Sequence, residues 1–199
     1  PESVRSRRDY NRYLIDYPIS FGAGYLKPNL IAETAVYIRA FPNDKMKASS
    51  IVADYLLEAG FDSLIKEHGI EPFEVNVQLA TRTFIDKIFA IADYYLSGTV
   101  DEHSRHLYDV YKLMGIVSID DELATLLKEV REERKPHQNC HSAKDGVDLK
   151  STLIEIIEND AYKKDYEEIT ASLLFFIADF CFVSRYAFKN NIAVIFVFR

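Results

Sequence analysis

The stretch EHSRHLYDVYKLMG, residues 102–115, gathers side chains able to do chemistry on what its spacing predicts to be a single helix. His103 and His106 stand three residues apart, and Arg105 stands four residues before Asp109. Residues at these separations share one face of a helix. The histidines are therefore candidates for a metal site, and Arg105 with Asp109 for a surface ion pair or for contact with a phosphate group.

Zinc is the first metal to consider, because the segment HQNCH adds His137, Cys140 and His141 to the two histidines of the helix. Structural zinc is normally held by four nitrogen or sulfur ligands, often including a Cys-x-x-Cys pair. The sequence contains no such pair, and we interpret these residues as polar side chains on a helix surface and in a loop. Cys181 lies in an apolar run, where a cysteine is usually a packing residue rather than a nucleophile.

Glu33 is a carboxylate in the middle of a predicted strand. The alternation of Leu30, Ala32, Thr34 and Val36 against their neighbours indicates that residues 29–42 are extended. Glu33 is then either a solvated residue on the polar face, with Arg39 nearby, or a carboxylate that the strand offers to a metal ion for phosphoryl transfer.

Lys87 lies off the apolar stripe of a helix predicted from Thr81 or Thr83, as N-cap, to Gly98. The stripe that we expect to be buried consists of Phe84, Ile85, Ile88, Phe89, Ala92 and Leu96. A lysine beside such a stripe is usually solvated. Together with Arg105 it is alternatively suited to a triphosphate, the arginine as a fork and the lysine as a point charge.

The spacing of apolar residues changes along the chain and indicates which of these residues lie on strands and which on helices. Before residue 80 the pattern is mixed: 29–42 and 73–79 alternate as strands do, 61–69 reads as a helix, and 49–60 fits a strand or a short helix. Beyond it apolar residues recur about every 3.6 positions, which indicates helices. Helices are expected over 81–98, 102–115, 119–135, 148–160 and 161–176, with a polar linker loop over 137–148. This order predicts an α+β fold.

Composition narrows the class of protein. The chain has 199 residues and a formal net charge of −7, which gives no global signal for nucleic acid or an anionic membrane. Two cysteines and no signal peptide favour a reducing cytoplasm over a disulfide-bonded, secreted protein. The longest apolar run, residues 171–183, is too short to span a bilayer and contains Asp179.

Three segments, LIAET (30–34), RTFIDKIFAIADYY (82–95) and HSRHLYDVYKLMG (103–115), together resemble the AbiEii/AbiGii-type toxin family. These are nucleotidyltransferases of the DNA-polymerase-β-like superfamily from bacterial abortive-infection toxin–antitoxin systems. The resemblance covers roughly residues 10–175 and implies Mg²⁺-dependent transfer of a nucleotide from an NTP, commonly onto RNA. It places the strand carboxylate that binds metal on Glu33, and a Lys-x-x-Ala helix on Lys87. The basic helix that ends in an aspartate falls on Arg105 and Asp109.

The same resemblance implies roles and a layout. Lys87 and Arg105 would contact the NTP phosphates, with Lys87 and Asp109 as catalytic residues and Asp109 as base or orienter. The layout is a partial nucleotidyltransferase region with a mixed sheet over 1–80, a helical bundle over 81–175 and an unassigned tail over 176–199. The family's Gly-Ser turn with an acidic pair does not precede LIAET. Since one carboxylate cannot hold two metal ions, we expect a catalytically incomplete chain or the C-terminal part of a longer protein.

Two functions from different classes are therefore carried forward. The first is a nucleotidyltransferase toxin, here truncated or catalytically incomplete, that uses an NTP and Mg²⁺ and acts in the cytoplasm on an acceptor expected to be RNA. The alternative is a non-catalytic interaction protein that keeps the fold as a scaffold for a cognate antitoxin. A measurement of NTP binding distinguishes these two functions, because only the first function requires NTP.

Overall fold

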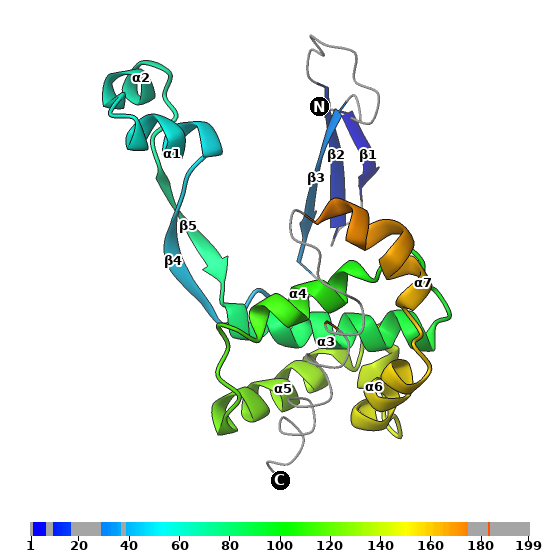
Figure 1. Ribbon diagram of the computed structural model, residues 1–199. Coiled ribbons are helices and arrows are strands. Elements are labelled where there is room, and N and C mark those ends of the chain that lie inside the picture. Colours follow the sequence, from blue (N-terminus) through cyan, green and yellow to red (C-terminus); the bar gives the residue numbers. More distant parts are fainter. Residues whose placement is uncertain (1, 7–9, 17–28, 37–38, 175–182, 184–199) are drawn as a thin grey trace. The chain divides into compact units, whose positions relative to one another are not determined.

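A computed structural model describes residues 2–6, 10–16, 29–36, 39–174 and 183. The chain divides into two compact units, Pro1–Arg39 and Ala40–Arg199, which we describe separately. Of the tail at 176–199, the described part of the chain contains only Val183. Figure 1 shows strands in the N-terminal part of the sequence and helices in the rest, so the predicted α+β class is confirmed.

The first unit is a three-stranded antiparallel sheet in the order β1-β2-β3. Its strands are β1 (Glu2–Ser6), β2 (Tyr10–Asp16) and β3 (Asn29–Ala35). The predicted strand at Glu33 is thus confirmed. The register places Arg12 directly opposite Glu33, which brings these two side chains to the same face of the sheet.

The second unit begins with a two-stranded antiparallel sheet formed by β4 (Asn43–Ala48) and β5 (Phe73–Gln78). Between the strands lie two helices, α1 (Ile51–Glu58) and α2 (Asp62–Glu67). Residues 49–60, whose pattern fitted either a strand or a short helix, thus contain a helix. The Ser50 side chain caps α1 by accepting the Ala53 N–H at 3.0 Å. The strands among the described residues lie in two antiparallel sheets, whereas the sequence pointed to one mixed sheet.

The remaining helices form the main hydrophobic core. They are α3 (Ala80–Leu96), α4 (Arg105–Leu113), α5 (Asp121–Arg134), α6 (Leu149–Glu158) and α7 (Lys163–Asp165), with short helical turns at His141–Ala143, Tyr166–Thr170 and Ala171–Leu173. The centre of this core is α3, where Ile85, Ile88 and Phe89 are fully buried against Leu107 and Val110 of α4. Among the described residues no helix combines the length and the apolar character needed to cross a membrane.

Three local expectations were wrong. Helix α3 begins after Leu79 rather than at a threonine cap, and the Thr83 hydroxyl instead donates back to the Leu79 carbonyl. Leu96 is 42% exposed, because it ends the last turn of α3 beyond the core. The segment 137–148 is no polar linker, since Cys140, Ser142 and Ala143 are buried against the helices.

Candidate functional site

Lys87, His106 and Asp109 meet where α3 packs on α4. The Lys87 ammonium Nζ lies 2.8 Å from the Asp109 carboxylate oxygen Oδ2 and 3.2 Å from the His106 ring nitrogen Nδ1. His106 Nδ1 is 3.6 Å from the same carboxylate oxygen, which is too long for a good hydrogen bond. The side chains of Lys87 and Asp109 are 28% and 39% exposed, so the group is open to small molecules.

The sequence interpretation of His106 as a surface residue was wrong. The residue is only 8% exposed, since the face of α4 that carries Leu107 and Val110 turns it toward α3. Its ring lies nearly parallel to those of Tyr94 and His103, which stack on each other with their centroids 3.5 Å apart. Stacking and burial fix the orientation of the His106 ring and leave Nδ1 directed at the charged pair.

The carboxylate of Asp109 is held in its ionised form. The Lys87 ammonium at 2.8 Å favours this form, because a nearby positive charge stabilises a carboxylate. Asp109 is therefore a negative charge at the end of the Lys87 side chain. Lys87 and Arg105 were both predicted to lie near Asp109. Asp109 pairs with Lys87, and within the described residues no ion pair joins Asp109 to Arg105.

Arg105 opens α4 and is exposed. It stands four residues before Asp109, so the two side chains leave the same face of the helix about 5–6 Å apart at Cβ. The structure thus brings Lys87, Arg105 and Asp109 to one region of the second unit. An exposed guanidinium beside a half-buried ammonium is suited to an anionic ligand with several oxygens.

The first turn of α4 is fixed from a distant part of the chain. Oδ1 of Asp165, in α7, accepts the Glu102 backbone N–H at 2.7 Å, and Oδ2 accepts the Ser104 N–H at 2.9 Å. Burial raises the pKa of Asp165, but the hydrogen bonds from Ser104 and Glu102 outweigh it and hold the pKa below its usual value. The hydroxyls of Ser104 and Thr170 also share a buried hydrogen bond of 2.7 Å.

Glu33, the predicted metal ligand, belongs to the first unit and is exposed on β3. Its Oε1 atom lies 3.7 Å from Nε of Arg12 and accepts a hydrogen bond of 2.5 Å from the Tyr10 hydroxyl. Asp16 shares its face of the sheet but is four residues beyond Arg12, about 13 Å along the strand. A carboxylate oxygen is a ligand that Mg²⁺ prefers, but in this structure the Glu33 carboxylate lies beside the Arg12 guanidinium.

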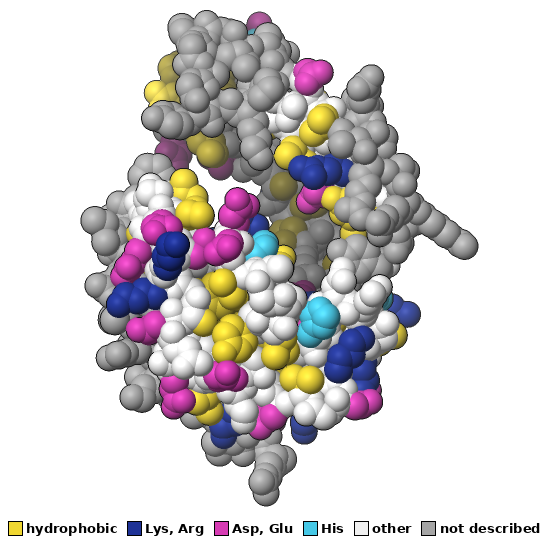
Figure 2. Space-filling view, turned by 90° about the vertical axis from the view of Figure 1, so that its right-hand side faces the viewer, with side chains coloured by type: hydrophobic (Ala, Val, Ile, Leu, Met, Phe, Trp, Pro, Cys, Tyr) yellow, Lys and Arg dark blue, Asp and Glu magenta, His cyan; other side chains and the backbone are white. Residues whose placement is uncertain are grey.

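No group of three or more histidine, cysteine, aspartate or glutamate side chains that could hold a metal ion occurs in the described ranges. The described residues therefore do not by themselves fit a two-metal site. On the face drawn in Figure 2, acidic and basic side chains alternate with hydrophobic ones rather than forming a patch of one sign.

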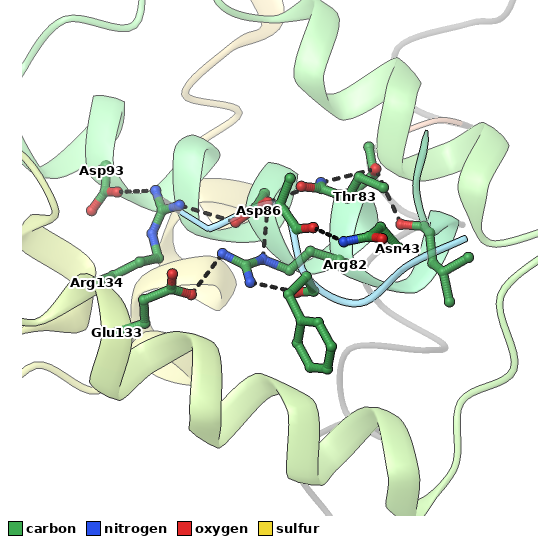
Figure 3. A network of polar contacts seen from close by, with 11 residues as sticks. Asn43, Arg82, Thr83, Asp86, Asp93, Glu133 and Arg134 are labelled. Atoms are coloured by element: carbon green, nitrogen blue, oxygen red, sulfur yellow. Dashed lines mark hydrogen bonds and ion pairs between the residues drawn. The ribbon is translucent and has the colours of Figure 1, made fainter. Parts of the chain in front are cut away.

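A network of charged side chains joins α3 to α5 (Figure 3). Arg134 donates to Asp86 Oδ1 and to Asp93 Oδ2, each at 3.1 Å, and its guanidinium lies 5.2 Å from the ring centre of Phe89. Asp93 also accepts the backbone N–H and the hydroxyl of Ser142 at 2.7 and 2.6 Å. These bonds explain why the polar segment around Ser142 is buried.

Arg82 extends this network toward the base of β4. The residue is 2% exposed, and its side chain contacts Asp86 at 3.1 Å, Glu133 at 2.9 Å and the Phe41 carbonyl at 2.7 Å. Sequence reasoning missed Arg82 and Asp93 as buried residues. Both residues lie on the same face of α3 as Phe89, a position that indicates burial. A charged residue at such a position is not predicted to be buried unless its partner is known.

A comparison of the whole sequence with protein families matches residues 1–190 to the family described as "Nucleotidyl transferase AbiEii toxin, Type IV TA system". The chain belongs to this family, and the resemblance found from its three segments is confirmed. Neither the curated proteins nor the solved structures contain a significant match to the chain. The family assigns the chain to the nucleotidyltransferase toxins of toxin–antitoxin systems, in which an antitoxin is the second component.

Proposed function

We propose that this protein is a nucleotidyltransferase toxin whose second unit binds the triphosphate of an NTP and whose acceptor is RNA. The observation that carries the proposal is the contact between Lys87 and Asp109 at 2.8 Å, between α3 and α4, with Arg105 exposed on the same helix. Membership of the AbiEii family supports the reaction class.

Each side chain has a role that its chemistry allows. Lys87 gives a compact positive charge and Arg105 a planar fork, and both kinds of cation bind phosphate oxygens. Asp109, ionised and half-buried, is placed either to accept the proton of an attacking hydroxyl or to orient Lys87. All three positions rest on the α3–α4 interface, which the core packing of Leu107 and Val110 makes rigid.

Glu33 is the residue that we assign to the metal, because a strand carboxylate is the expected ligand in this class of enzyme. In this class of enzyme a bound Mg²⁺ supplies positive charge for phosphoryl transfer. Since Glu33 is paired with Arg12 and belongs to no group of three or more metal-ligating side chains among the described residues, we derive no step through the metal.

The experiment is label transfer from radioactive NTPs to total RNA, in the presence of Mg²⁺, by the protein expressed from its complete reading frame. We expect transfer by the wild type and its loss, by at least a hundredfold, in Lys87→Ala, because a phosphate-binding cation has been removed. Lys128→Ala is the matched control, since Lys128 is exposed on α5.

Absence of transfer by the wild type, or equal transfer by Lys87→Ala and Lys128→Ala, contradicts the proposal. Calorimetry with the four NTPs gives an independent result, because binding requires Lys87 and Arg105 whether or not an acceptor is present. A protein that binds no NTP but forms a stable complex with its antitoxin would instead be the non-catalytic scaffold.

A further inference from the structure

His106 is the one buried imidazole that contacts the proposed nucleotide site within the described part of the chain. It is 8% exposed, and its Nδ1 atom faces Lys87 Nζ at 3.2 Å while the opposite sides of the ring pack against protein. A helix-surface histidine is ordinarily solvated, so the burial of this one beside a charged pair needs a reason.

We propose that His106 is a positioning residue that accepts a hydrogen bond from Lys87 and holds the ammonium group in place for the NTP triphosphate. The inference rests on the proposed function and adds to it a residue that acts through Lys87. The evidence is the set of distances among three atoms, Lys87 Nζ, His106 Nδ1 and Asp109 Oδ2.

The number of hydrogen-bond donors on the lysine explains the role. An ammonium group has three N–H donors and no acceptor. Asp109 takes one donor at 2.8 Å and His106 takes the second at 3.2 Å, so one remains for a phosphate oxygen. With two partners fixed, the direction of the third donor is fixed as well. With Asp109 alone, the ammonium rotates about a single contact and samples many directions.

This role requires a particular protonation state of the ring. An ammonium N–H can donate to Nδ1 only when that nitrogen carries a lone pair, so the ring proton must reside on Nε2. The ring itself is held by burial and by the neighbouring rings of Tyr94 and His103. The backbone of α4 is held by Asp165, and Nδ1 therefore has little freedom to turn away from Lys87.

Steady-state kinetics of two substitutions test the role. His106→Phe keeps an aromatic ring but removes the acceptor, and we expect it to raise KM for the NTP about tenfold, as loss of a hydrogen bond to a charged group does. His106→Asn places an amide oxygen close to the position of Nδ1, and we expect it to restore KM to within about threefold of wild type. A purely structural role would lower the active fraction, and so kcat, and leave KM unchanged.

His68→Phe is the control, because His68 is exposed and follows α2, outside α3 and α4. The inference is overturned if Lys87→Ala abolishes transfer while His106→Phe leaves KM unchanged, or if the Asn variant is as impaired as the Phe variant. The proposed function itself fails by a different result, namely no transfer by the wild type or full transfer by Lys87→Ala.

The protonation state gives a second measurement that does not depend on turnover. Long-range nitrogen–proton correlation spectra of histidine-labelled wild-type protein report which ring nitrogen carries the proton. We expect His106, assigned by its loss in His106→Asn, to carry it on Nε2 alone. A proton on Nδ1 at neutral pH would overturn the inference, because Lys87 then has no acceptor on this ring.

Discussion

Asp165 receives the backbone N–H of Ser104 at 2.9 Å, so a carboxylate 61 residues along the chain caps the helix that carries Arg105, His106 and Asp109. A cap usually comes from the residue that begins the helix. Here Ser104 adopts helical dihedral angles and its side chain makes no capping bond, which leaves that task to Asp165. The geometry of the proposed site therefore depends on the packing of α7 as well as on α3 and α4.

Replacement of Asp165 by Asn tests this dependence. The two N–H groups bind different carboxylate oxygens, and an amide has only one oxygen, so one N–H must face an NH₂ group. We expect the free energy of unfolding to fall by about 1–3 kcal/mol, the cost of a buried unsatisfied donor. Denaturation in urea measures it, with exposed Glu168→Gln as control. Equal midpoints for the two variants would show that the cap contributes nothing.

His103 makes stability depend on pH. Its pKa is lowered, mainly because burial disfavours the imidazolium and further because His106 and Arg105 lie nearby. The unfolded chain therefore binds the proton more readily than the folded one, and stability falls as the pH drops below about 6.5, the pKa of a free histidine. We expect melting temperatures to decline between pH 7 and 5, and to decline less in His103→Phe. If the melting temperature declined equally with pH in both proteins, a group other than His103 would cause the decline.

The buried network around Arg134 is expected to be sensitive to the loss of one partner. Arg134→Met would leave Asp86 and Asp93 without their shared guanidinium, and Asp93 has a side chain only 10% exposed. Breaking a buried ion pair in this way typically costs about 3–5 kcal/mol. Lys128→Met on the same helix is the control, because Lys128 is exposed. Guanidinium denaturation of the two variants gives the comparison, and a difference below 1 kcal/mol or so would contradict the expectation.

Asp109→Asn separates charge from shape at the proposed site. The amide keeps the size of the side chain but removes the negative charge that pairs with Lys87 at 2.8 Å. If Asp109 accepts a proton or orients Lys87, label transfer should fall by about a hundredfold or more while the fold is retained. Circular dichroism checks the fold. Transfer within twofold of wild type would exclude Asp109 from both roles.

The periodicity of the sequence was sufficient to predict most of the buried face of α3. Phe84, Ile85, Ile88, Phe89 and Ala92 recur at helical spacing, and all five are buried. Periodicity cannot predict that Arg82 is buried on the same helix. Its burial depends on Glu133 and on the Phe41 carbonyl, which are distant in sequence. The same reason explains the error at Ser142, whose burial depends on Asp93.

The sequence did not predict which of the candidate site residues pair with each other. Spacing on α4 indicated a pair between Arg105 and Asp109, but the core residues of α3 and α4 bring Lys87 close enough to take the carboxylate. A helix contact of this kind depends on how two elements pack, which a pattern along one element does not contain. The predicted domain boundary near residue 80 and the roles of the site residues stay predictions.

The two-stranded sheet of β4 and β5 has a consequence for how the protein opens locally. Two strands alone are only marginally stable in water, and Met46 and Phe73 on this sheet are 53% and 62% exposed. The amides of these strands should therefore exchange with deuterium through a local unfolding of low free energy. The amides of α3 around Ile88 should exchange only when the whole helical core unfolds. The contact from Arg82 to the Phe41 carbonyl then marks where one cooperative folding unit ends and the next begins.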